Sequence, residues 1–390
     1  MKRPSTTHLG LSLFLCAAFV FVAFLLSAAL SPLHADQHFD PEKARELVEQ
    51  LGAPKYSERQ LAGTALLKMG IDVLPILNEG TEHPDREVRY RSAQLLDIVR
   101  EADFTRRLAA FEASVNDNED FGLPLWLRFR NLVGAGPETR RIFVEMQRAE
   151  SSLLRAAGDS DEKTKALVAD RMQEMQKQLQ FQPRGLPIGS TAALLFVSGN
   201  EKVQTPDQHG WLIYNYVLQQ PFNDQLRDGP RREPLRKLLG NWIRHNTSSA
   251  IAYQSMMVAM QFDLTEGLIP AEKMLSQAGQ APQVRQYAVL TVARFGDVNW
   301  TTKLAPLLED TGVCMQFQNN NMNYTTQVRD VALAATIHLY KLDPKTFGFD
   351  NIRTNPQYGF DPASLGFKSD DDRTAAKKKW DEFRAKGEKK

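Results

Sequence analysis

Histidine has the widest chemical use of any residue type in this chain, because its side chain can act as an acid, a base or a metal ligand near neutral pH. The seven histidines are His8, His34, His38, His83, His209, His245 and His338. None begins an H-E-x-x-H pattern, which would place two zinc ligands and a general base on one helix. His338 falls within a helical pattern and is interpreted as a packed residue. His209 and His245 could meet in space, but no pattern requires it.

The densest acidic run is residues 370–372, three consecutive aspartates. As a calcium loop it lacks the interposed spacing of ligands and the glutamate at the twelfth position. Three carboxylates are favourable at the N-terminus of a helix, where the helix dipole is positive. We therefore interpret residues 370–372 as the solvated start of a charged helix over residues 373–383.

The chain contains no Walker A motif, no G-x-G-x-x-G and no G-x-S-x-G. With two cysteines it also has no Cys-x-x-Cys-His haem site. The sequence therefore predicts no catalytic residue, no cofactor and no metal, and it favours a protein that is not an enzyme. An enzyme with an unrecognised site within residues 160–260 stays open as an alternative.

Composition narrows the class of protein. Of the 390 residues, 42% are apolar and 24% are charged, as in ordinary globular proteins. Lysine and arginine number 48 and aspartate and glutamate 47, which argues against a nucleic-acid partner, since that would require a strong basic excess. Two cysteines far apart argue against a disulfide scaffold and a cysteine-based zinc site. Cys16 belongs to an apolar stretch, and Cys314 is expected to be buried and inert.

The N-terminus has the pattern of an export signal. Lys2 and Arg3 precede the mostly apolar residues 9–30, and polar residues follow from His34. Cleavage is expected before Asp36 or before Leu30, although this mostly apolar stretch of 22 residues could also span a membrane and be kept as an anchor. Both outcomes place the body outside the cytoplasm, because the basic end stays inside. We expect the periplasm or cell envelope of a bacterium, with membrane contact only through residues 9–30.

From residue 40 onward the apolar spacing is helical. Within residues 58–69 an apolar stripe includes Leu61, Ala62 and Leu66, with Ser57 as the predicted N-cap and Gly70 as the stop. A short helix with Pro75 in its first turn follows, and a third helix is expected to open at residue 85. Residues 211–218 could form a strand, but their aromatic residues also fit a helical face, and a helix is predicted.

An internal repeat is visible at three valines, Val88, Val284 and Val328. Each is followed by an arginine and, four residues on, by a small residue. The last two valines are 44 residues apart, within the ~40–47 residues of HEAT and armadillo units. We expect the three valines to be buried at equivalent places in helical pairs, and each arginine to be solvated or to cap.

These segments resemble HEAT repeats, in particular those of exported, largely uncharacterised bacterial HEAT-repeat proteins. The resemblance lies in residues 56–62 (YSERQLA), 67–70 (LKMG), 73–77 (VLPIL), 84–89 (PDREVR) and 327–333 (QVRDVAL). It covers residues 40–100 and 280–345. The fold class expected is all-α: a HEAT-like α-solenoid of paired antiparallel helices, with an irregular helical middle region and an extended C-terminal tail.

Turn-forming residues set the expected boundaries. Residues 1–35 form the signal peptide or anchor, 40–157 the N-terminal HEAT-like region and 158–228 an irregular helical region with a linker. Residues 229–345 form the C-terminal HEAT-like repeats, and 346–390 a tail that ends in a short charged helix.

The segment of residues 311–326 is the least ordinary in the chain. It is longer than most loops between helices and is rich in amides, and long loops often carry function. Phe317, Met322 and Tyr324 lie outside any apolar stripe and are the predicted partner-binding residues, although a loop folded over the solenoid edge is the structural alternative. The function expected is an exported scaffold that binds another, unidentified protein. The alternative non-enzymatic function is that of a membrane-anchored structural component of the cell envelope.

Overall fold

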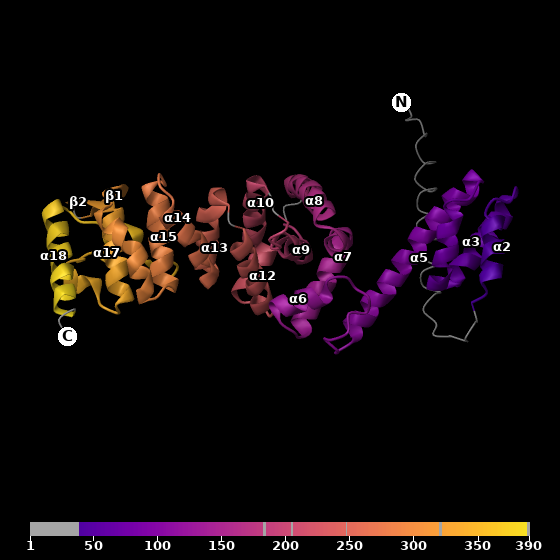
Figure 1. Cartoon of the computed structure of the whole chain (residues 1–390), viewed down its shortest axis with the longest axis horizontal. Helices are drawn as coiled ribbons and strands as arrows, with labels where there is room; N and C mark the ends of the chain where they lie inside the picture. The colour runs from indigo at the N-terminus through magenta and orange to yellow at the C-terminus, as the bar shows by residue number, and fades with distance from the viewer. Residues whose placement is uncertain (1–38, 182–184, 204–205, 247, 320–321, 388–390) are drawn as a thin grey trace, which may run out of the picture. The chain divides into compact units, whose positions relative to one another are not determined.

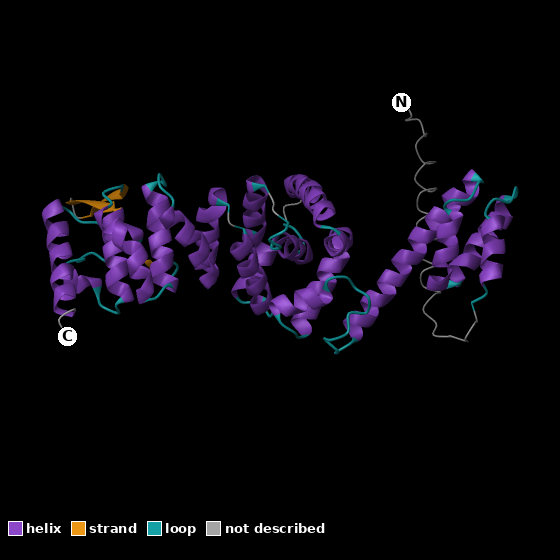
Figure 2. Ribbon diagram, in the orientation of Figure 1, coloured by secondary structure: helices purple, strands orange, loops and turns teal. Residues whose placement is uncertain are grey.

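The computed structural model describes residues 39–181, 185–203, 206–246, 248–319 and 322–387. Helices account for 73% of the structure and strands for 5%, so the predicted helical class is confirmed, with small β hairpins in addition (Figure 2). The chain divides into two compact units, Met1–Thr105 and Arg106–Lys390, here called unit 1 and unit 2. Each is described by itself.

Unit 1 contains α2 (Pro41–Gln50), α3 (Tyr56–Lys68), α4 (Leu74–Gly80) and the first part of α5 (Arg86–Ala113). The predicted helices are therefore present, and Pro75 lies in the first turn of α4 as expected. Ser57 is not an N-cap, because α3 begins one residue earlier. Ala62 and Leu66 are buried in the core, but Leu61 is 71% exposed, so its assignment to the buried stripe is wrong.

Two arginines in unit 1 repeat one arrangement. Arg59 in α3 donates hydrogen bonds to the carbonyl oxygens of Ala53 and Pro54, at 2.8 and 3.0 Å. Arg89 in α5 does the same for the two equivalent carbonyls before its own helix, at 2.6 and 2.8 Å. Each arginine therefore fixes the turn that leads into its helix. The expectation that Arg89 is solvated or caps a helix is not confirmed, because the carbonyls of His83 and Pro84 lie between α4 and α5.

The first part of unit 2 contains α6 (Trp126–Val133), α7 (Pro137–Asp159), α8 (Asp161–Phe181), α9 (Ile188–Ser198), α10 (Asp207–Leu218), α11 (Gln220–Arg227) and α12 (Arg232–His245). The helix predicted for residues 211–218 is confirmed as α10. Helix α9 is buried from Gly189 to Ser198, against α7 on one side and α12 on another. A Cβ at Gly189 would lie 2.3 Å from the carbonyl oxygen of Glu145, so only glycine permits this close crossing.

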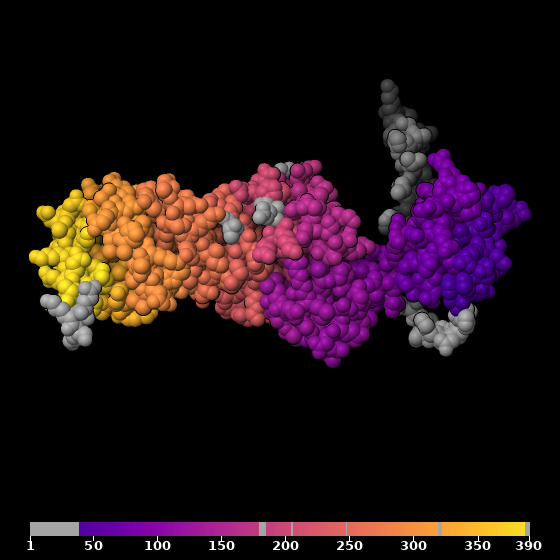
Figure 3. Space-filling view, in the orientation of Figure 1, coloured from indigo at the N-terminus to yellow at the C-terminus, as the bar shows by residue number. Residues whose placement is uncertain are grey.

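The second part of unit 2 contains α13 (Ala252–Phe262), α14 (Leu268–Ser276), α15 (Pro282–Phe295), α16 (Thr301–Leu304), α17 (Val328–Leu339) and α18 (Asp370–Gly387). Helices α10, α13, α15 and α17 contact one another in that order (Figure 1). In the space-filling view the colours of unit 2 follow one another with little mixing, because its helices pack mainly on near neighbours in sequence (Figure 3).

The three repeat valines do not occupy equivalent places. Val88 and Val328 are buried, whereas Val284 is only partly buried and packs against the edge of the core. Val88 and Val284 are each the third residue of a helix, but Val328 is the first residue of its helix. The expectation of equivalent burial is therefore wrong in this detail.

The segment of residues 311–326 is not a loop. It forms an antiparallel hairpin of β1 (Val313–Asn319) and β2 (Met322–Gln327), in which Phe317 is paired with Tyr324. Thr325 in β2 also exchanges two backbone hydrogen bonds with Phe367, at 3.0 and 3.2 Å. The tail thereby supports the hairpin from its second edge.

The sequence predicts an extended tail, and this prediction is wrong. The tail is folded onto the helices. Besides a second hairpin of β3 (Thr354–Asn355) and β4 (Gly359–Phe360), it contains α18, which begins at Asp370 as expected. Trp380 in α18 is buried against Phe347. Arg373 is also buried, and its Nε donates to the carboxylate of Asp330 in α17 at 2.6 Å. Burial of the apolar side of α18 therefore holds the tail in place.

Candidate functional site

The three residues predicted to bind a partner lie on the β1–β2 hairpin. The rings of Phe317 and Tyr324 stack, with centroids 5.1 Å apart. Tyr324 is 5% exposed and belongs to the core, so the expectation that folding leaves all three side chains free is wrong for this residue. Met322 is 44% exposed at the start of β2. A role of the three residues in binding stays a prediction.

The histidines do not converge. His338 packs edge-to-face on Phe360 at 5.1 Å, and burial lowers the pKa of its imidazole, which confirms it as a packed residue. His209 and His245 line different pockets. In the described part of the chain, no three His, Cys, Asp or Glu side chains are grouped closely enough to hold a metal ion. His8, His34 and His38 lie outside that part.

Two other expectations concern Cys314 and the membrane. Cys314 is buried as predicted, and burial raises the pKa of its thiol to about 12, so the thiol is protonated at neutral pH. No helix within the described residues is long and apolar enough to cross a membrane. Residues 9–30, for which membrane contact is predicted, lie outside the described residues.

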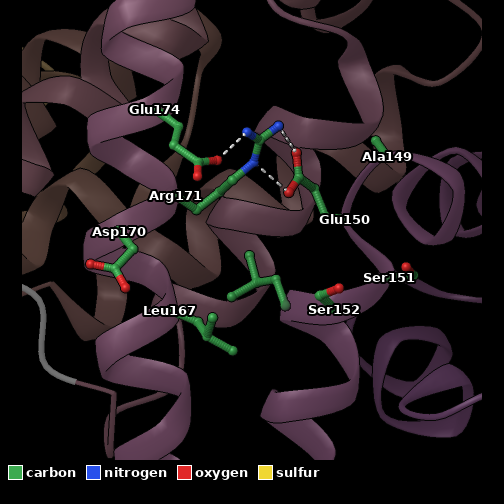
Figure 4. A pocket seen from close by; sticks show the side chains of 9 residues that line it. Ala149, Glu150, Ser151, Ser152, Leu167, Asp170, Arg171 and Glu174 are labelled. Carbon is green, nitrogen blue, oxygen red and sulfur yellow. Dashed lines mark hydrogen bonds and ion pairs between the residues drawn. The ribbon is translucent and has the colours of Figure 1, made fainter. Parts of the chain in front are cut away.

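A buried carboxylate marks a break in α7. Glu150 has non-helical backbone angles (φ −138°, ψ 40°) in the middle of that helix, and its side chain is buried. Arg171 in α8 donates to both carboxylate oxygens, at 2.8 and 2.9 Å (Figure 4). The hydroxyl of Ser190 in α9 donates to one of them at 2.7 Å. One carboxylate thus ties together three helices at the point where α7 bends.

A pocket of about 330 Å³ opens beside this bend, between α7 and α8. Asp170 and Glu174 of α8 line it, and Glu174 also accepts a hydrogen bond from Arg171 at 2.9 Å (Figure 4). The hydrogen bonds to Glu150 contribute most to raising the pKa of Arg171. Because three donors already pair with the buried carboxylate, we interpret Glu150 as a structural residue that holds the bend of α7.

Four tyrosines from separate parts of unit 2 form another candidate site. It consists of Tyr214 in α10, Tyr253 in α13, Tyr287 in α15 and Tyr358 between β3 and β4, and we call it the tyrosine ladder. The rings of Tyr253 and Tyr287 meet edge-to-face at 5.3 Å, and those of Tyr287 and Tyr358 at 5.5 Å. Tyr214 interacts electrostatically with Tyr253. All four side chains are partly exposed.

The ladder is supported by the core. Burial raises the pKa of Tyr287 to about 12 and raises the pKa values of Tyr214 and Tyr358 as well, so these three phenols are neutral at pH 7. Tyr287 and Tyr358 pack their inner edges against the hydrophobic core. The neighbouring Tyr253 contributes to raising the pKa of Tyr287. The result is a surface of fixed aromatic rings, with hydroxyl groups that can donate and accept.

Sequence reasoning missed the ladder. Its members stand 39, 34 and 71 residues apart, and only Tyr214 had been noted, as part of a helical face. No spacing rule connects them, because contacts between separate helices and a hairpin bring them together.

The chain matches no protein-family model, and no curated protein or solved structure shows significant similarity to it.

Proposed function

We propose that this chain is an exported scaffold, without enzymatic activity, that binds another protein through the tyrosine ladder. The observation that carries the proposal is the meeting of four partly exposed tyrosines from four separate elements. Tyrosine is enriched among the residues that dominate protein interfaces. It offers a large contact area and a hydroxyl group, and it loses little conformational freedom on binding.

The support from the core makes the ladder suitable for this role. Tyr253 and Tyr287 already meet edge-to-face before any partner arrives. Side chains that are already ordered lose less entropy in a complex, and more of the contact energy then contributes to affinity. Folding requires the inner edges of these rings, whereas the exposed edges are free for contact.

The HEAT-like architecture belongs to this proposal. The arrangement of Arg59 and Arg89, thirty residues apart, supports a repeated unit within unit 1. In unit 2, support comes from the ordered contacts of α10, α13, α15 and α17. Arrays of this kind bind partners across several consecutive helices. The ladder crosses three of these four helices.

Export is supported by the basic and then apolar N-terminus, Lys2 and Arg3 followed by residues 9–30. Mass spectrometry of the protein from cells distinguishes the two forms proposed. A chain that begins at Asp36 or Leu30 is released, and one that begins at Met1 is anchored. Recovery of the chain from the cytoplasmic fraction with Met1 intact would contradict export.

Photo-cross-linking tests the binding surface. We would place p-benzoylphenylalanine at position 214 or 358 of the full chain, irradiate cells and identify adducts by mass spectrometry. The control positions are Tyr56 and Tyr90 in unit 1, which are more exposed than the ladder residues.

The proposal predicts one dominant protein adduct from both ladder positions and not from the control positions. Tyr253→Ala in the same chain should remove that adduct while the protein stays folded. If all four positions give the same adducts, or if Tyr253→Ala leaves the adduct unchanged, the ladder is not the binding surface.

A further inference from the structure

A pocket of about 740 Å³ lies between α8 and α10, and its walls carry mainly amide and aromatic side chains. Helix α8 contributes Gln173 and Gln176 to the lining. Helix α10 contributes Gln208, His209 and Trp211. We call it the Trp211 pocket. Its volume is within the range of about 300–1,000 Å³ that is typical of small-molecule sites.

The three glutamines give the pocket its hydrogen-bonding character. Within the described part of the chain none of their amide groups has a hydrogen-bond partner, and all three side chains are exposed. An amide donates two hydrogen bonds and accepts two, so it can pair with a hydroxyl group in either direction. Three amides around one pocket suit a ligand that carries several hydroxyl groups.

Trp211 gives the pocket a flat apolar wall. It is 50% exposed, whereas Trp126, Trp242 and Trp380 are fully buried. The face of an indole ring is electron-rich and attracts the weakly positive C–H groups of a ligand packed on it. One face of a pyranose ring presents several such C–H groups, while its hydroxyl groups point outward toward the rim.

His209 and Lys177 define the charge of the pocket. His209 is buried, and its Nδ1 has no hydrogen-bond partner among the described residues. Burial lowers the pKa of this imidazole, so the ring is neutral at pH 7. Among the described residues that line the pocket, Lys177 is the only charged one and none is a carboxylate. A metal ion would have no carboxylate ligand there, and a multiply charged anion would meet a single cation.

We propose that the Trp211 pocket binds a neutral oligosaccharide, with one sugar ring packed on Trp211 and its hydroxyl groups hydrogen-bonded to Gln173, Gln176 and Gln208. This site does not depend on the tyrosine ladder. Trp211 and Tyr214 lie on the same helix, but no tyrosine of the ladder is among the described residues that line the pocket.

The test is a titration of the purified chain with cellobiose, N,N′-diacetylchitobiose, mannobiose and maltotriose, followed by tryptophan fluorescence and calorimetry. At least one of these sugars should bind saturably. Trp211→Ala should weaken that binding by about 10-fold or more, as loss of an aromatic contact does. Trp300→Ala, which removes a partly exposed tryptophan outside the pocket, should leave the affinity unchanged.

Two further variants keep the test decisive. Gln208→Leu should also weaken binding even if Trp211→Ala proves unstable, and Lys177→Met should have no effect on a neutral sugar. The proposal is overturned if none of the four sugars binds, if Trp211→Ala and Gln208→Leu both bind like the unaltered chain, or if Lys177→Met abolishes binding.

Discussion

The buried ion pair between α18 and α17 gives the sharpest stability prediction. Arg373 and Asp330 have side chains that are 8% and 0% exposed. The guanidinium donates to both oxygens of Asp330, at 2.6 and 3.1 Å, and to the carbonyl oxygen of Thr325 at 3.0 Å. Replacing Arg373 by methionine keeps the bulk of the side chain and removes all of these donors.

The expected cost follows from what is left behind. In Arg373→Met the carboxylate of Asp330 stays buried with the backbone N–H of Gln327 as a remaining donor, at 2.8 Å. Breaking a buried pair in this way costs about 3–5 kcal/mol. That is a large part of the roughly 5–15 kcal/mol by which a domain is stable. Urea unfolding followed by circular dichroism measures the loss as a lower midpoint for unit 2.

Two comparisons make the result interpretable. Lys378→Met removes an exposed charge from the same helix and should change stability by no more than ~0.5 kcal/mol. The double variant Asp330→Asn with Arg373→Met contains no buried charge, and it should be more stable than Arg373→Met alone. A loss below about 1 kcal/mol in Arg373→Met, or a double variant less stable than the single one, would refute the reasoning.

Three other predictions concern separate parts of the chain. Cys314 should not react with a thiol reagent at pH 8 in the native protein and should react fully in urea, because burial raises its pKa to about 12; rapid native labelling would contradict this. Burial also raises the pKa of Tyr287 to about 12, so its contribution to stability is complete below pH ~10 and is lost as the pH rises toward 12. Tyr287→Phe should therefore flatten the fall in stability measured across that range. Arg89→Ala should destabilise unit 1 by about 1–2 kcal/mol through two lost hydrogen bonds, seen as faster amide exchange at the start of α5, and unchanged exchange would argue against its role in fixing this turn.

Features that depend on nearby residues could be predicted from the sequence. The helical spacing around Leu66, and the placement of Pro75 and Gly70, correctly indicate α3 and α4. In α8 the apolar positions Val168 and Met172 are buried as their spacing suggests. Side chains three and four residues apart share a helix face whatever the rest of the chain does, so these inferences need no tertiary information.

Features that depend on distant residues could not be predicted. Apolar and polar residues do alternate in residues 315–318 and 322–325, but these runs are short, and Thr325 takes its further hydrogen bonds from the distant Phe367. Arg373 stands in a sequence of charged residues and resembles a solvated one, but its partner Asp330 lies 43 residues away. The tyrosine ladder has the same origin, since Tyr253 and Tyr358 become part of one surface only after the helices pack.

The close crossing of α7 and α9 has a consequence for the order of folding. Helix α9 has 11 residues and no solvent-facing side, and a helix of that length is marginal in water by itself. It gains stability only when α7 and α12 are already in place around it, and Gly189 must fit against the backbone of Glu145 in α7. A chain of loosely coupled repeats can begin to fold at any point along its length. Here α9 joins its neighbours into one cooperative block, which must form as a whole and sets a single barrier for that part of the chain.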